Sequence, residues 1–198
     1  MEYVVRLELH SGCRLAVVRR RAASHELSKV VPAACGTVWN VIRSQQVPGA
    51  GRHVAVYLDG QINLEVGVEL DGPFGGHGEV VVSATPAGPV ATTTHFGPYH
   101  LLHEAHEAIC RWCANNGYTL AGPNWEVYGH WKDEWNTDPT KITTEVFYLL
   151  TADAVRLPNA ALYLTTAALA DSGVQVPRAA ATGEPGPSGG APQSNRPT

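Results

Sequence analysis

One pattern of residues occurs twice in the sequence and decides the fold: residues 62–70 read INLEVGVEL, and residues 142–150 read ITTEVFYLL. In each copy apolar residues alternate with other residues, which is typical of a half-buried strand. Three shorter matches keep the same order along the chain, namely Leu15–Val17 with Val90–Thr92, Trp39 with Trp112, and Val56–Tyr57 with Val127–Tyr128. The sequence therefore predicts two copies of one module, at about residues 4–71 and 79–151.

Each module is predicted to run strand, helix, strand, strand. The segments concerned are 14–19, 24–46, 54–59 and 64–70 in the first module, and 90–95, 98–115, 125–131 and 144–151 in the second. The second helix has an apolar stripe and ends at the stop signal Asn116-Gly117. We expect segments 4–9 and 79–85 to pair as additional strands. The predicted fold class is α+β: two antiparallel half-sheets, each with one helix, that meet across a pseudo-twofold axis.

The composition indicates a globular protein without a nucleic-acid or membrane partner. The 198 residues are 44% apolar and 16% charged, with a net charge of −4 and no basic block. No apolar run is long enough to span a bilayer, and no signal peptide precedes the fold, so we expect a cytoplasmic protein. We expect residues 1–151 to form the folded domain, residues 152–176 a C-terminal extension with a short helix, and residues 177–198 a disordered Pro/Gly/Ala tail.

Two groups of side chains suggest metal or redox chemistry, and we interpret both more simply. Cys110 and Cys113 have CxxC spacing but lie within the second helical pattern, so we read all four cysteines as reduced thiols. His100, His103 and His106 recur every three residues on that helix and do not form an HExxH motif. An amphipathic helix explains them, so neither a metal nor a cofactor is expected.

Several short motifs of the second module resemble the GyrI-like small-molecule-binding domain, which is also the effector-binding part of AraC- and MerR-type drug-sensing regulators. They are VATTTHFGPY at residues 90–99, a helix with Trp112 before Asn116-Gly117, GPNWEVY at 122–128, and TEVFYL at 144–149. The resemblance covers about residues 4–151, in a stand-alone form without room for a preceding helix-turn-helix. It implies a ligand groove between the two halves and an affinity for lipophilic, often cationic, aromatic compounds.

Strand alternation predicts which side chains face that groove. Val66, Val68 and Leu70 should face the helices, which leaves Glu65 on the open face; by the repeat, Glu145 and Phe147 share that face. We assign Val54, Val56, Leu58, Trp125 and Val127 to the core, which places Glu126, Tyr128 and His130 on the open side. The repeat match of Tyr128 adds Tyr57. Tyr148 is expected to be a core residue.

The aromatic residues strengthen this prediction, because seven of the fifteen lie within residues 118–148, close to several carboxylates. Ring faces beside carboxylates attract organic cations. Trp131 and Trp135 lie in or beside a loop insertion and are candidate lid residues. The predicted ligand-binding residues are therefore Glu145, Phe147, Glu126, Tyr128, Tyr57, Glu65, Trp131, Trp135 and His130.

Two functions remain open on these grounds. The first is a non-enzymatic binder of lipophilic or cationic aromatic molecules, for multidrug or xenobiotic binding or sequestration. The second, which the resemblance to GyrI-like proteins implies, is a hydrolase of cyclopropane-bearing DNA-alkylating natural products, in which Glu145 or Glu126 would position or deprotonate water. We favour the first and assign no catalytic residue. The natural ligand and the oligomeric state stay open.

Overall fold

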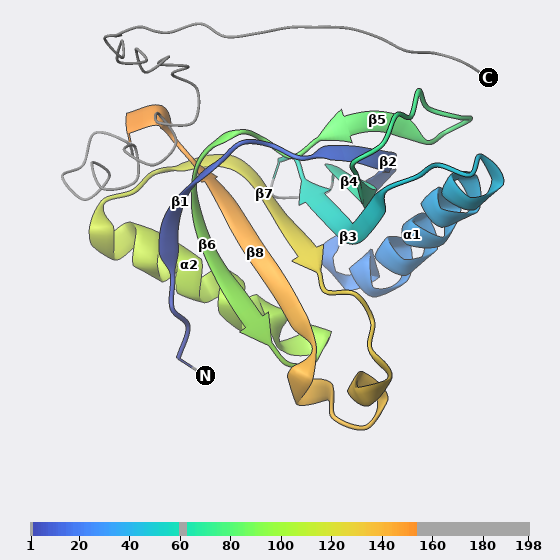
Figure 1. Ribbon diagram of the computed structural model, residues 1–198. Helices are drawn as coiled ribbons and strands as arrows, with labels where there is room; N and C mark the ends of the chain where they lie inside the picture. The colour runs from blue at the N-terminus through green and yellow to red at the C-terminus, as the bar shows by residue number, and fades with distance from the viewer. Residues whose placement is uncertain (1, 60–62, 154–198) are drawn as a thin grey trace, which may run out of the picture.

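The computed structural model describes residues 2–59 and 63–153, so the predictions for residues 154–198 lie outside the described residues. Its main elements, labelled in Figure 1, are β1 (Arg6–His10), β2 (Arg14–Arg21), α1 (Leu27–Ser44), β3 (Ala50–Tyr57), β4 (Asn63–Leu70), β5 (Val81–Ala84), β6 (Gly88–Phe96), α2 (Leu102–Asn116), β7 (Leu120–Tyr128) and β8 (Thr143–Leu150). Short 3-10 turns precede both helices and lie between β7 and β8. The described helices include none that is long and apolar enough to cross a membrane.

The eight strands form one antiparallel sheet in the order β1-β6-β8-β7-β3-β4-β2-β5. The predicted duplication is confirmed: β2-α1-β3-β4 and β6-α2-β7-β8 follow the same order of elements, and their strands are arranged symmetrically about the β3–β7 pair. Because β3 and β7 pair directly, from His53 opposite Tyr128 to Tyr57 opposite Asn124, the two half-sheets are continuous.

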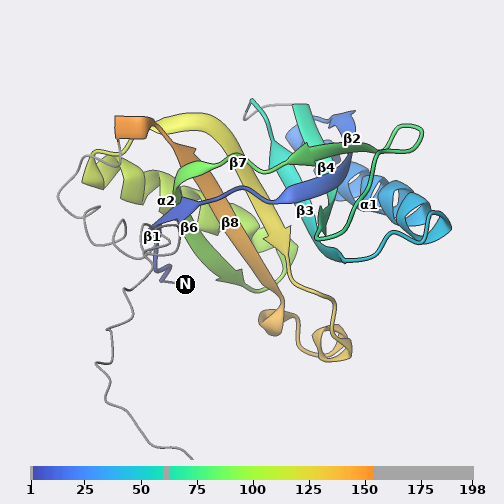
Figure 2. The same ribbon diagram turned by 45° about the horizontal axis from the view of Figure 1, so that its top comes forward.

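Both helices cover the same face of the sheet, behind it in the views of Figures 1 and 2. Helix α1 packs Ala34, Val38 and Ile42 against strands of the first module. Helix α2 packs Ala105 and Ile109 against strands of the second. Each helix therefore covers its own module, and the junction of β3 and β7 is left between them.

The opposite face of the sheet, here called the far face, is also buried. Its apolar cluster consists of Leu15, Val17, Val54, Val56, Val90, Trp125 and Val127. The connections from β1 to β2 and from β5 to β6 cross this face (Figure 1) and are tied together, because the Cys13 amide donates to Thr85 Oγ1 at 2.8 Å and the Thr85 amide donates to the Cys13 carbonyl at 2.9 Å. The sheet therefore has two apolar faces.

This second buried face makes one set of predicted orientations wrong. Ala55 lies opposite both Val66 and Glu126, so Ala55 and Glu126 face the helices. The buried Val54, Val56, Trp125 and Val127 consequently belong to the far face, and Leu58 is 42% exposed. The expectation that Glu126, Tyr128 and His130 share a face with Glu145 is wrong, because burial alone does not identify the helix face of a strand that is apolar on both sides.

Candidate functional site

A cavity of about 1090 Å3 opens between the two helices, over the junction of β3 and β7. Helix α1 contributes Val31, Cys35 and Trp39, and helix α2 contributes His103 and His106. Its floor and rim are formed by side chains of the sheet and of the loop after β7, namely His53, Tyr57, Asn124, Glu126, Tyr128, His130, Trp131 and Tyr148. A concave, largely apolar space with a few convergent polar groups is the usual form of a small-molecule site.

Glu126 is the central polar group of this cavity. Its side chain is 6% exposed, and its carboxylate accepts hydrogen bonds from His106 Nε2 at 2.8 Å and from the hydroxyl of Tyr57 at 3.2 Å. The Tyr128 hydroxyl donates to the same carboxylate. On the other side of the imidazole, Nδ1 of His106 lies 2.9 Å from the hydroxyl of Tyr148. The fold therefore supplies three hydrogen-bond donors to a nearly buried carboxyl group, the partners that such a group requires when it is taken out of water.

The tyrosines around Glu126 remain hydrogen-bond donors at any ordinary pH. Burial, and then the nearby Glu126 carboxylate, raises the pKa of Tyr57 and that of Tyr128 above the usual value for a phenol. The pKa of Tyr148 is raised as well, first by burial and then by Cys110. An ionised phenolate beside a carboxylate is thus avoided in the folded protein.

We expect these shifts to reduce stability in alkali. In the unfolded chain tyrosine ionises near about pH 10, whereas Tyr57 and Tyr128 keep their protons in the folded state above that pH. Unfolding then releases protons, so the free energy of unfolding should fall as the pH rises above about 10. Urea unfolding at about pH 8 and pH 11 measures this fall, which should be smaller in Tyr57→Phe. An equal fall in the variant would contradict the assignment.

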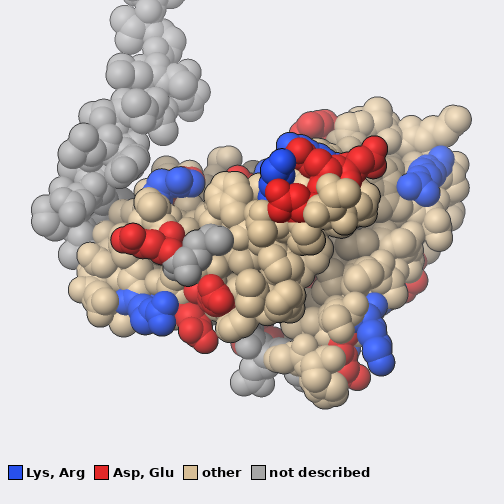
Figure 3. Space-filling view, turned by 90° about the horizontal axis from the view of Figure 1, so that it is seen from below, with Lys and Arg blue, Asp and Glu red and all other residues tan. Residues whose placement is uncertain are grey.

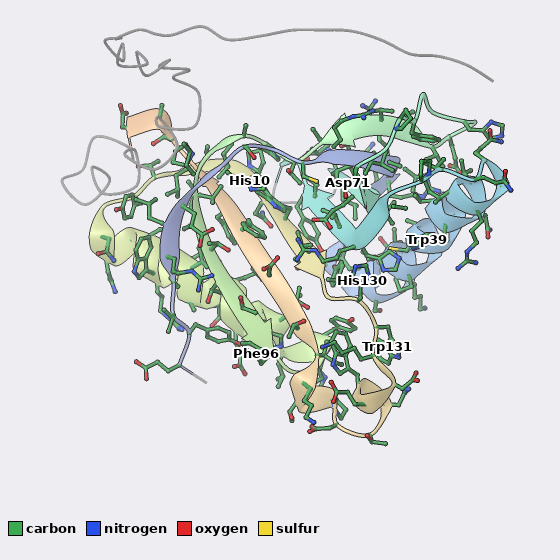
Figure 4. The ribbon with its side chains drawn as sticks, viewed as in Figure 1. His10, Trp39, Asp71, Phe96, His130 and Trp131 are labelled. Carbon is green, nitrogen blue, oxygen red and sulfur yellow. The ribbon has the colours of Figure 1, made fainter. Side chains whose placement is uncertain are left out.

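The rim of the cavity is aromatic. Trp39 Nε1 donates to His53 Nε2 at 2.5 Å, and burial, followed by the charge of His130, lowers the pKa of His53. Figure 4 shows Trp39, His130 and Trp131 near the lower end of α1. Trp131 is 56% exposed and meets the buried Trp135 edge-on, with ring centroids 5.6 Å apart. Trp131 therefore presents a ring at the opening of the cavity.

Five of the nine predicted ligand-binding residues line the cavity: Glu126, Tyr128, Tyr57, His130 and Trp131. The other four lie outside its lining. Glu145, on the far face, bonds to Arg52 at 2.6 Å, and Phe147 stacks on Trp125 with ring centroids 5.3 Å apart. Glu65 forms an ion pair with Arg19 at 3.0 Å, and the buried Trp135 packs edge-on against Trp131.

Two polar residues at the centre of the cavity were not predicted as ligand-binding residues, namely His106 and Tyr148. The first was interpreted as part of a polar helix face, and the second as a core residue. Tyr148 does face the helices as predicted, and a buried tyrosine hydroxyl requires a partner, which was the available signal. Among residues 2–59 and 63–153, no group of three or more His, Cys, Asp or Glu side chains is placed to hold a metal ion.

The protein has an α+β fold in which two helices on one face of the sheet leave a cavity with a buried carboxylate between them. This combination is typical of a protein that binds small molecules. The family model of the GyrI-like small molecule binding domain matches residues 20–150, and the chain belongs to this family. No curated protein matches the sequence.

Solved structures support the same fold. The crystal structure of the EcmrR C-terminal domain aligns with a TM-score of 0.61 at 23% identity, over 76% of this chain and 98% of that one. In the cryo-EM structure of the EcmrR–DNA complex, the TM-score is 0.59 at 21% identity, and the alignment spans 75% of this chain and 57% of the other. The structure of SAV2435 bound to tetraphenylphosphonium aligns with a TM-score of 0.54 at 12% identity, over 81% of this chain and 99% of that one.

Proposed function

We propose that the protein binds lipophilic aromatic cations in the cavity between α1 and α2. The observation that carries this proposal is the Glu126 carboxylate, which is nearly buried among aromatic rings. A cation entering the cavity meets this charge where solvent screens it little, while tyrosine and tryptophan faces supply apolar contact and cation–π attraction. SAV2435, which has a similar fold, is bound to such a cation, tetraphenylphosphonium.

The hydrogen bonds of the two candidate acid–base groups in the cavity favour binding over hydrolysis. A general base must have an acceptor atom free to take a proton from water. The Glu126 carboxylate already accepts three hydrogen bonds, and both ring nitrogens of His106 are engaged by Glu126 and Tyr148. Chromatography after incubation with cyclopropane-bearing alkylators tests the hydrolase, and a hydrolysed product would reverse this ranking.

We propose no nucleic-acid partner for this domain. The net charge is −4, and on the face of the described residues seen in Figure 3 acidic and basic side chains are interspersed, without a continuous basic surface. A protein that binds DNA through phosphate contacts concentrates Lys and Arg on one face. We therefore propose small molecules as the partners of this domain.

Filling the cavity tests the proposed function. Gly36 lies on α1 at the cavity wall, and a Cβ added there meets no atom within 4 Å. Gly36→Phe should occupy the space and weaken tetraphenylphosphonium binding by at least about tenfold, while stability holds or rises because glycine is a poor helix former. Isothermal titration calorimetry and thermal unfolding measure the two effects.

The control is Ala33→Phe, which adds the same ring to an exposed position of α1 outside the cavity lining. This variant should bind like the wild type. If the wild type does not bind the phosphonium, the proposed function is wrong; if Gly36→Phe binds like the wild type, the ligand occupies a different site.

A further inference from the structure

Within residues 2–59 and 63–153, His106 is the one imidazole in contact with the carboxylate at the centre of the cavity. It projects from α2, its side chain is 21% exposed, and its two ring nitrogens contact Glu126 at 2.8 Å and Tyr148 at 2.9 Å. It therefore lies between a fixed charge and a hydroxyl group, and the hydroxyl can either donate or accept a hydrogen bond.

This geometry is compatible with two protonation states. In the neutral state, Nε2–H donates to Glu126 and Nδ1 accepts from the Tyr148 hydroxyl, so the His106–Glu126 pair carries one negative charge. In the protonated state, Nδ1–H donates to the Tyr148 oxygen while the bond to Glu126 is kept, and the pair has no net charge. Rotation of a single hydroxyl proton is the only rearrangement that this change requires.

From this arrangement we infer that His106 is the specificity-determining residue of the cavity, since it sets the charge that a ligand meets. With neutral His106 the cavity favours cations. With protonated His106 it loses that preference and accepts neutral aromatic molecules as readily. The inference rests on the proposed function and identifies the residue that selects among ligands by charge.

The phenols that face the His106–Glu126 pair stay uncharged between about pH 5.5 and 8. From the sheet, Tyr57, Tyr128 and Tyr148 face the pair, and burial raises the pKa of each phenol further above its ordinary value of about 10. From α2 itself, Cys110 interacts with Tyr148, and burial raises the pKa of the Cys113 thiol to about 11. The carboxylate and the imidazole are therefore the groups whose charges decide the local potential.

The other histidines of the cavity are less suited to set the charge near Glu126. His53 accepts a hydrogen bond from Trp39 at Nε2, and burial lowers its pKa, which favours the neutral ring. His100, His103 and His130 are exposed at the rim, where solvent screens their charges. Among the described residues, none of these four histidines forms a hydrogen bond to Glu126.

The test measures binding of tetraphenylphosphonium, whose charge does not depend on pH, to the full chain between about pH 8 and pH 5.5. The affinity of the wild type should fall roughly tenfold over this range, because protonation of His106 cancels the negative charge that attracts the cation. His106→Gln keeps a neutral donor near Glu126 and should bind with a nearly constant affinity. His77→Gln makes the same change at an exposed position outside the cavity lining and should keep the fall with pH.

Proton exchange gives a second readout. Because the cation favours neutral His106, its binding near pH 6 should release a proton, as reciprocal linkage requires. Calorimetry in two buffers with different heats of ionisation measures this release, which should disappear in His106→Gln. Wild-type affinity that is independent of pH, or a fall that persists in His106→Gln, overturns the inference while leaving the proposed function in place. A wild type that binds at no pH overturns both.

Discussion

Glu126→Gln should lose most of the affinity of the protein for aromatic cations. The substitution keeps the shape of the side chain but removes the charge of a carboxylate that is 6% exposed. A unit charge about 5 Å from that carboxylate interacts by about 3 kcal/mol at an effective dielectric constant of about 20, which corresponds to roughly a hundredfold in affinity. A neutral aromatic ligand of similar size should lose only a few-fold. Titration calorimetry with one ligand of each kind measures both losses.

The matched control makes the same chemical change on the far face. Glu145→Gln removes a carboxylate that is bonded to Arg52 and lies outside the cavity lining, so the affinity for both ligands should stay at the wild-type value. Equal losses for the cationic and the neutral ligand in Glu126→Gln would refute an electrostatic role for this residue. A larger loss in Glu145→Gln than in Glu126→Gln would place the cation on the opposite side of the sheet.

The largest effect on stability is expected from Gly67→Ala. Gly67 lies in the middle of β4, and a Cβ built on it would stand 1.8 Å from the carbonyl oxygen of Ala16 and 2.8 Å from the Cα of Val17. Both atoms belong to the backbone of β2, so the strand itself must move. Overpacking of this kind commonly costs about 1–3 kcal/mol, and displacement of a paired strand places this variant at about 3 kcal/mol or above. Thermal unfolding should show a fall of roughly 10 °C.

Gly36→Ala is the matched control for this prediction, because a Cβ at Gly36 meets no atom within 4 Å. Its position within α1 should make the alanine variant equally stable or more stable by up to about 1 kcal/mol. If Gly67→Ala melts at the wild-type temperature, strands β2 and β4 do not approach each other as closely as the structure shows.

The fold could be predicted from the sequence because its signals are local. The repeat around residues 62–70 and 142–150, the apolar stripe of α2 and the stop at Gly117 each depend on a short window. That β3 and β7 join the two half-sheets into one was not predicted, because pairing between distant strands has no comparable signal in a single sequence. For the same reason, Val54 and Trp125 were assigned to the wrong face of the sheet. The face on which they lie depends on which strands pair, and this pairing has no signal in a single sequence.

The candidate site was predicted in part for the same reason. Glu126, Tyr128 and Tyr57 were selected because acidic and aromatic residues cluster in the second module and because the repeat links the two tyrosines. Glu145 was grouped with them by alternation, yet it lies on the far face with Arg52. Nothing in the sequence around His106 indicates that it lines the cavity, because its contact with Glu126 depends on how α2 crosses the sheet.

The edge strands of the sheet bind the two modules into one unit. In sequence, β1 precedes β2 of the first module but pairs with β6 of the second, and β5 precedes β6 of the second module but pairs with β2 of the first. This reciprocal arrangement is the topology of a strand-swapped dimer fused into a single chain. A chain cut between residues 71 and 79 would leave each half without the strand that closes its edge. We therefore expect the two modules to fold together rather than as separate units.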